Sequence, residues 1–480
     1  MSKAHLLALC ILVTIYSQAS ATEPDELLST SQDQQNVAVT IYNDNLALVK
    51  DQRKIQIKAG LNTLAFRDVS AQIRSETALL RSLTQPGKLS VIEQNFDYDL
   101  LTPGKLLEKY VGKSVVIIHT NPATGVETSE QAQVLSANSG VVLKIGDRIE
   151  TGIPGRIVYP NVPANLRDRP TLVMSLNNGG TAQQEMELSY LTGGLGWKAD
   201  YVAELNASED KLDLSGWVTL SNNSGATYRN AQLQLVAGDV NQVHNEMRSM
   251  PRMAKADMAM AAPAPRMAEE SLFEYHLYTL DHPTTLAENQ TKQVSLLTAS
   301  AVPVRKELVL QGADYYYRSS YGELGQKMKV GVFIEFDNKE SAHLGMPLPK
   351  GVVRVYKRDG AGNAQFVGED HIDHTPKNEK VRLKLGDAFD VTADKKQTDF
   401  KKLPDPAKGS ALFESAYEIV LKNAKKEAVI VTVQEPIPAD WKVLQESHKH
   451  EKATSNTAAW KVSVPAEGTT TLSYRVQVRY

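Results

Sequence analysis

Apolar and polar residues alternate along most of this 480-residue chain. The clearest example is TTLSYRVQVRY at residues 470–480, where Leu472, Tyr474, Val476 and Val478 alternate with polar side chains. KMKVGVFIEF (327–336) and VRLKL (381–385) follow the same period of two. Successive side chains of a strand leave opposite faces, so this pattern predicts antiparallel strands with one buried face.

Turn sequences separate these apolar runs. They include Asn177-Asn178-Gly179-Gly180, Asn222-Asn223-Ser224-Gly225, Asp359-Gly360 and Ala466-Glu467-Gly468. Many short strands joined by such turns are typical of β-sandwiches. We therefore predict an all-β protein made of several antiparallel, immunoglobulin-like sandwich units, with a small barrel-like insert and little helix.

One segment predicts a helix, TPGKLLEKYV at Thr102–Val111. Thr102 suits the N-cap, Pro103 suits the first turn, and Gly112 ends the run. Leu106, Leu107, Tyr110 and Val111 would form its apolar face.

Changes in composition along the chain predict its segments. In order, these are a signal peptide (1–21), a mobile segment (22–36), an N-terminal β region (37–110), the barrel-like insert (111–165), a first sandwich (166–243), a disordered Met/Ala/Pro-rich linker (244–270), a second sandwich (271–403) and a C-terminal immunoglobulin-like sandwich (411–480).

Residues 1–21 have the layout of a secretory signal peptide. Lys3 precedes an apolar run, Leu6–Tyr16, and Ala19-Ser20-Ala21 provides small residues before a cleavage position. We expect cleavage near Ala21 and a periplasmic or secreted protein. Cleavage would also remove Cys10, the only cysteine, so the mature chain would hold neither disulfides nor cysteine ligands.

The net charge of the chain indicates which classes of macromolecule it can bind. The chain has 53 basic and 56 acidic residues, and removing Lys3 leaves 52 − 56 = −4 for the mature protein. This acidic balance argues against nucleic-acid binding. No later apolar stretch reaches the length of about 20 residues that spans a bilayer, so we expect no transmembrane segment in the mature chain.

Methionines concentrate in the predicted linker. Met247, Met250, Met253, Met258 and Met260 belong to a group of six within 21 residues, whereas the whole chain has 11. Thioethers are soft ligands that select Cu(I), so copper handling is one reading. A disordered linker that happens to use methionine is the other, and the nearby prolines and alanines favour it.

Two histidine groups are weaker metal candidates. On a strand, His371 and Asp373 would share one face while Asp370 and His374 share the other, which separates the ligands. His448 and His450 would share a face, although surface histidines in polar loops commonly have no metal role.

Two groups of aromatic residues could either fill the core of a sandwich or contact a ligand or partner. Trp197 and Tyr201 follow the glycines Gly194 and Gly196, and they suit either a sandwich core or a platform for a sugar ring; we favour the core. The run Tyr315-Tyr316-Tyr317 fits either a strand that buries Tyr316 or a contact patch for a partner.

The chain carries none of the common enzyme signatures, such as H-E-x-x-H, G-x-S-x-G or a P-loop. The leading hypothesis is a non-catalytic envelope protein that binds or scaffolds a protein or glycan partner, for example through an exposed strand edge. The alternatives are copper handling and an envelope hydrolase, for which Asp370 and Asp373 are the nameable acid pair.

Five longer strings carry a family resemblance. They are LSYLTGGLGWKADYVAEL (188–205), GVVRVYKRDGAGNAQFVGEDHIDHTP (351–376), LKLGDAFDV (383–391), QTDF (397–400) and PADWKVLQESHKHE (438–451). The chain resembles the secreted bacterial family of domain of unknown function 4139. This family is distantly related to mucoidy inhibitor A-like proteins, which carry a coiled coil that this chain lacks. The resemblance implies no established activity and no catalytic residues.

Overall fold

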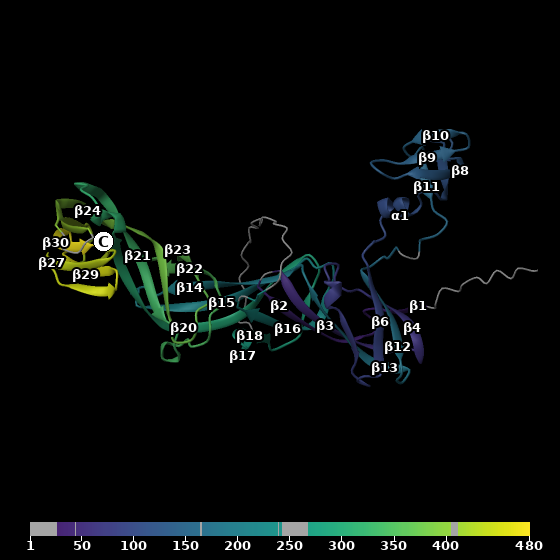
Figure 1. Ribbon diagram of the computed structural model, residues 1–480, viewed down its shortest axis with the longest axis horizontal. Coiled ribbons are helices and arrows are strands. Elements are labelled where there is room, and N and C mark those ends of the chain that lie inside the picture. The colour runs from purple at the N-terminus through teal and green to yellow at the C-terminus, as the bar shows by residue number, and fades with distance from the viewer. Residues whose placement is uncertain (1–25, 44, 164–165, 239, 242–266, 405–410) are drawn as a thin grey trace, which may run out of the picture. The chain divides into compact units, whose positions relative to one another are not determined.

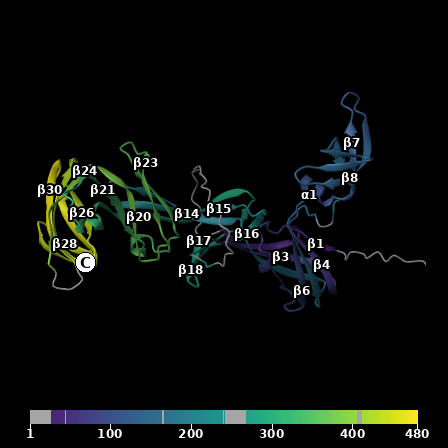
Figure 2. The same cartoon turned by 45° about the horizontal axis from the view of Figure 1, so that its top comes forward.

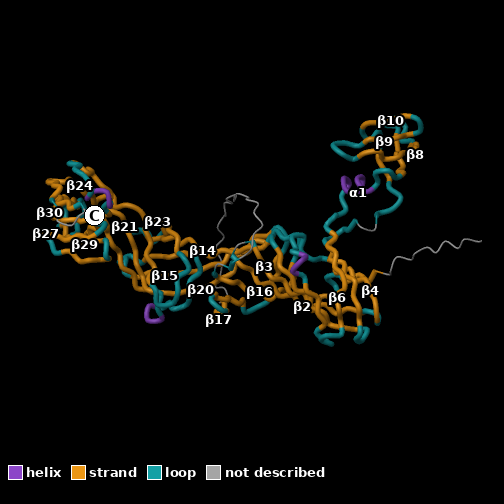
Figure 3. Tube along the Cα trace, viewed as in Figure 1, coloured by secondary structure: helices purple, strands orange, loops and turns teal. Residues whose placement is uncertain are grey.

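The computed structural model describes residues 26–43, 45–163, 166–238, 240–241, 267–404 and 411–480. About 65% of the chain is strand and 4% is helix, which confirms the predicted all-β class (Figure 3). The described residues form two compact units. One contains the described residues of 26–37, 48–192 and 224–226, and the other contains those of 38–47, 193–223 and 227–480.

The first unit begins with a four-stranded sheet in the order β1-β4-β12-β6. Its strands are β1 (Glu26–Ser29), β4 (Gly60–Arg67), β12 (Thr171–Asn178) and β6 (Leu89–Asp97). A second set runs in the order β3-β13-β5, with β3 (Leu46–Gln56), β13 (Gln183–Thr192) and β5 (Leu79–Ser82). The sequence predicts mobility over residues 22–36, whereas Glu26–Ser29 pairs with β4 in parallel.

A buried arginine ties these strands together. Arg53 is 1% exposed and pairs with Asp51 at 2.8 Å. Its guanidinium donates to the carbonyl oxygens of Ser29 and Arg67 and lies 3.7 Å above the Phe66 ring. Every polar group of this buried cation therefore faces an acceptor or a ring, which offsets the cost of removing its charge from water.

The same unit contains a separate five-stranded antiparallel sheet, in the order β10-β9-β8-β7-β11 without closure. Its strands are β7 (Ser114–Thr120), β8 (Glu127–Ser136), β9 (Val142–Ile145), β10 (Arg148–Thr151) and β11 (Arg156–Val158). The predicted helix is α1 (Pro103–Lys109), and the Thr102 side chain accepts a hydrogen bond from the Lys105 amide at 3.2 Å. Leu106, Leu107 and Tyr110 pack against this small sheet.

The second unit contains most of the strands. They are β2 (Gln34–Tyr42), β14 (Leu195–Leu205), β15 (Lys211–Asn222), β16 (Tyr228–Ala237), β17 (Met267–Leu272), β18 (Tyr275–Leu280), β19 (Thr284–Leu286), β20 (Gln290–Gln311), β21 (Glu323–Asp337), β22 (Gly351–Arg358), β23 (Ala364–Ile372), β24 (Lys380–Leu403), β25 (Leu412–Asn423), β26 (Val429–Pro436), β27 (Asp440–Glu446), β28 (His450–Thr454), β29 (Thr457–Val464) and β30 (Gly468–Arg479). Met267–Glu270, which falls in the predicted linker, belongs to β17 and pairs with β18.

Three long strands, β20, β21 and β24, contribute to two cores within this unit. β20 pairs with β15 along its first part and with β21 and β26 along its second. β24 pairs first with β21 and then with β25. All three belong to one 13-stranded sheet, and in Figures 1 and 2 they can be followed from the part that holds β14 and β15 to the part that holds β30. The predicted boundary between residues 403 and 411 therefore lies between two paired strands of one sheet.

The C-terminal core is built as the alternation predicts. Leu472, Tyr474, Val476 and Val478 are all buried, and Trp460 is fully enclosed and stacks on Tyr474. Residues that precede 411 also contribute to this core: Leu308, Leu310, Tyr316, Tyr317, Val330, Val391 and Ala393.

Gly351 tests the parallel pairing of β22 with β14. A Cβ added there would lie 2.3 Å from the Ala199 carbonyl oxygen, a backbone atom that cannot rotate away. We expect Gly351→Ala to lower the free energy of unfolding by about 1–3 kcal/mol, as other overpacked substitutions do. Gly360→Ala is the matched control, because a Cβ there meets nothing within 4 Å. Urea denaturation of both variants measures the difference, and equal stabilities would contradict the pairing.

Candidate ligand pocket

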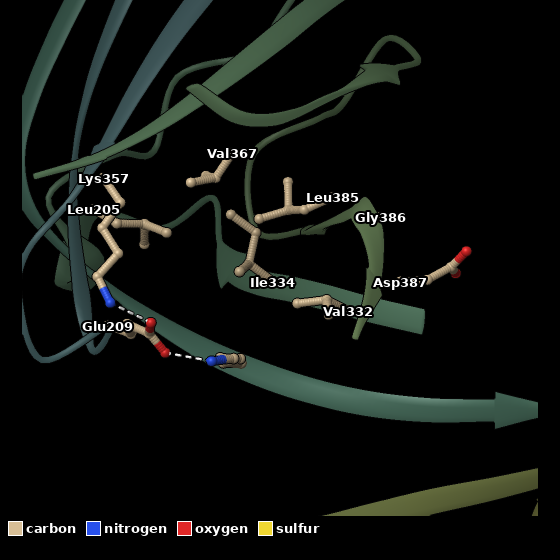
Figure 4. Close-up of a pocket in the computed structure, with 10 residues that line it drawn as sticks. Leu205, Glu209, Val332, Ile334, Lys357, Val367, Leu385, Gly386 and Asp387 are labelled. Carbon is tan, nitrogen blue, oxygen red and sulfur yellow. Dashed lines mark hydrogen bonds and ion pairs between the residues drawn. The ribbon is translucent and has the colours of Figure 1, made fainter. Parts of the chain in front are cut away.

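A cavity of about 150 Å³ opens in the second unit. Its apolar walls come from five side chains: Leu205 on β14, Val332 and Ile334 on β21, Val367 on β23 and Leu385 on β24 (Figure 4). A cavity of this size holds a small apolar group. The walls derive from four strands that sheet pairing fixes, so the cavity is part of the scaffold rather than a product of one loop.

The strand register places two lysines at the rim. Lys306 on β20 lies opposite Ile334, and Lys357 on β22 lies beside Leu205. The third charged group is Glu209, in the turn between β14 and β15. Its carboxylate accepts a hydrogen bond from Lys306 Nζ at 2.5 Å and another from Lys357 Nζ (Figure 4). Two ammonium groups thus share one carboxylate, and these three side chains together carry one net positive charge.

The turn that carries Glu209 has unusual backbone geometry. Glu209 has φ of +58°, in the left-handed region that non-glycine residues seldom occupy. The Asn206 side chain holds the turn by accepting hydrogen bonds from the amides of Asp210 and Lys211.

Electrostatics keep Glu209 ionised. Burial raises the pKa of its carboxyl group, but hydrogen bonds and charge attraction from Lys306 and Lys357 outweigh burial and leave the pKa below its ordinary value of 4.5. A carboxylate held in this way is a poor general base at neutral pH, because its pKa lies far from the working pH.

The remaining lining residues offer little catalytic chemistry. Asp387 points away from the cavity in Figure 4 and lies 3.5 Å from the Lys329 ammonium. Among the described residues that line the cavity there is no Ser, Thr, Cys, His or Tyr. The pocket therefore combines an apolar interior with a cationic rim, an arrangement that suits binding.

The metal candidates have different outcomes. Met247, Met250, Met253, Met258 and Met260 lie outside the described residues, so copper handling stays a prediction. Elsewhere in the described ranges, no group of three or more His, Cys, Asp or Glu side chains is placed to hold a metal ion.

The candidate metal ligands Asp370, His448 and His450 form hydrogen bonds with other groups of the protein. Asp370 accepts hydrogen bonds from the backbone amides of His371 and Lys384, at 2.9 and 2.7 Å. His450 binds Glu446 at 2.8 Å, whereas His448 binds Ser447.

Trp197 and Tyr201 are core residues, as the favoured reading predicts. They are 6% and 0% exposed, and the Tyr201 hydroxyl donates to the Pro349 carbonyl oxygen at 2.8 Å. The tyrosine run forms a short 3₁₀ turn rather than a strand, and it buries Tyr317 as well as Tyr316, while Tyr315 is 50% exposed.

Sequence reasoning missed the rim of the pocket. Glu209, Lys306 and Lys357 lie in three segments separated by 50 residues or more, and nothing in their spacing joins them. The only local signal was the turn sequence Asn206-Ala207-Ser208-Glu209-Asp210.

Residues 186–480 match a family model described as "Domain of unknown function (DUF4139)". The match covers more than half of the chain and includes every residue that lines the pocket. No curated protein matches the chain. In the described part of the structure, no helix combines the length and apolar character that crossing a membrane requires.

The depressed pKa of Glu209 predicts a pH-dependent contribution to stability. Its ion pairs are complete above pH 4.5 and are lost as the pH falls through the lower folded-state pKa. We expect Glu209→Gln to lower the free energy of unfolding by up to about 1 kcal/mol at pH 7, since such partly exposed pairs contribute little. The difference from wild type should shrink as the pH falls below 4.5.

Urea unfolding at several pH values measures this effect. Glu204→Gln is the control, because Glu204, near the end of β14, pairs with one cation, Arg358, instead of two. A difference that stays constant as the pH falls from 7 through the titration of the carboxyl group would show that the lysines do not stabilise the ionised carboxylate.

Proposed function

The chain belongs to the DUF4139 family, whose activity is not known, and we propose that it is a non-catalytic binding protein of the bacterial envelope. Its ligand would be a small amphiphile that places an apolar group in the cavity and an anionic head at the rim. The observation that carries the proposal is the rim itself, where Lys306 and Lys357 share the single carboxylate of Glu209 above apolar walls.

Charge favours an anionic head over a cationic one. Each lysine ammonium has three donors, and Glu209 uses one from each, so donors remain for a second acceptor. A ligand carboxylate would complete the neutralisation of the rim. A ligand amine would add a third positive charge and repel both lysines.

The apolar walls favour a short chain or ring. Each buried methylene contributes about 0.8 kcal/mol to transfer from water, and the cavity has room for a few such groups. An envelope location fits this role and rests on the layout of residues 1–21, which is that of a secretory signal peptide.

Hexanoate, hexanol and hexylamine test the proposal as probes of equal chain length. We expect hexanoate to bind most tightly and hexylamine most weakly, measured by chemical-shift titration or calorimetry. Lys306→Gln with Lys357→Gln should weaken hexanoate binding roughly tenfold while leaving hexanol binding nearly unchanged, because only the carboxylate uses the ammonium groups.

A second variant tests the cavity. Val332→Phe would place an aromatic ring in the space and should abolish binding of all three probes. Ile430→Phe is the control, since it adds the same ring at a position that is 62% exposed and outside the pocket. Equal binding of hexanoate and hexylamine, or undiminished binding to Val332→Phe, would overturn the proposal.

A further inference from the structure

The C-terminal core contains a buried lysine and a buried glutamate in direct contact. Lys395 on β24 is 1% exposed and Glu435 on β26 is 0% exposed. Lys395 Nζ lies 2.6 Å from Glu435 Oε1. β24 and β26 are not neighbours in the sheet order, so this contact joins two strands across the core rather than along a ladder.

The surroundings hold both groups in place. Nζ lies 4.2 Å above the centre of the Tyr316 ring and 5.2 Å from that of Tyr417. The other carboxylate oxygen, Oε2, accepts a hydrogen bond from the Tyr317 hydroxyl at 2.9 Å. Gly312 closes the site, because a Cβ there would lie 2.1 Å from Oε2.

We propose that Lys395 and Glu435 condense to form an intramolecular amide cross-link between β24 and β26. The geometry supplies a nucleophile, an acyl carbon and an oxyanion donor in one enclosed site. The product would join the strands covalently in a chain whose single cysteine, Cys10, has no second cysteine with which to form a disulfide.

The reaction balances with the groups present. A proton first moves from the Lys395 ammonium to Oε1 along their 2.6 Å hydrogen bond, which gives a neutral amine and a carboxylic acid. The Nζ lone pair then attacks Cδ, and the charge that develops on Oε2 is stabilised by the Tyr317 hydroxyl. A proton from Nζ passes to the Oε1 hydroxyl, the Cδ–Oε1 bond breaks, and one water molecule leaves. Oε2 becomes the amide oxygen.

Burial assists the first step. Burial lowers the pKa of Lys395 more than the attraction of Glu435 raises it, so the neutral amine is easier to reach than in water. Burial also raises the pKa of the Tyr317 hydroxyl, which therefore stays protonated as a donor.

Proximity favours condensation over hydrolysis. In water, dilute amines and carboxylates remain separate, but groups held in contact reach effective concentrations of about 10⁵–10⁸ M. The site is also closed to bulk water, which removes the reactant of the reverse reaction.

The intact mass of the purified mature protein tests the cross-link. We expect a mass lower than the sequence requires by one water molecule, and a branched tryptic peptide that joins the segments containing Lys395 and Glu435. The full sequence mass together with a free Lys395 peptide would overturn the proposal and leave an ion pair. A lost water that maps to other residues would overturn it equally.

Two variants serve as controls. Lys395→Arg keeps a cation opposite Glu435 but offers no amine that deprotonates, and it should show its full sequence mass. Tyr317→Phe removes the oxyanion donor while keeping the ring, and it should slow the appearance of the cross-linked form by about 10²-fold or more after refolding from denaturant. A cross-link that forms at the wild-type rate in Tyr317→Phe would exclude the role assigned to this hydroxyl.

Discussion

The second unit depends on strands that stay paired beyond the limits of a single core. β20, β21 and β24 contain 22, 15 and 24 residues. β20 and β24 are therefore several times as long as an ordinary strand. Bulges interrupt the ladders of these strands, and between the bulges period-two alternation must hold, because a slip of one residue would turn buried side chains outward. Lys306 and Ile334 at the pocket, and Leu308 and Val330 in the C-terminal core, keep their positions through this one constraint.

Two buried cations, Arg53 and Lys395, are matched by partners. Arg53 has Asp51 and the Phe66 ring, and Lys395 has Glu435 and two tyrosine rings. Removing one member of such a pair would strand a charge in the core, at a cost of about 3–5 kcal/mol, whereas apolar pairs of the same volume are often neutral or better. Stability alone therefore does not account for a charged pair at the centre of a sandwich.

The sequence allowed the all-β class to be predicted, because alternation and turn residues are local signals. The helix at 103–109 could also be predicted from the sequence, since Thr102 caps its first turn and Pro103 begins it. The alternation even places Lys395 on the face of Val391 and Ala393, and Glu435 on the face of Val431 and Val433. Their contact could not be predicted, because it spans 40 residues and depends on which non-neighbouring strands of the sheet face each other across the core. The pocket could not be predicted either, because its residues are also far apart in the sequence.

The two lysine–glutamate clusters differ in solvent exposure, and this difference separates their roles. Glu209 and its lysines have side chains about 28–32% exposed, so water screens their attraction and each can exchange partners at little cost. An incoming anion can therefore compete for Lys306 and Lys357 without disrupting the strands that carry them. Lys395 and Glu435 have no such freedom, because no water replaces a lost partner. The exposed cluster suits reversible recognition, and the buried cluster suits a permanent connection between strands.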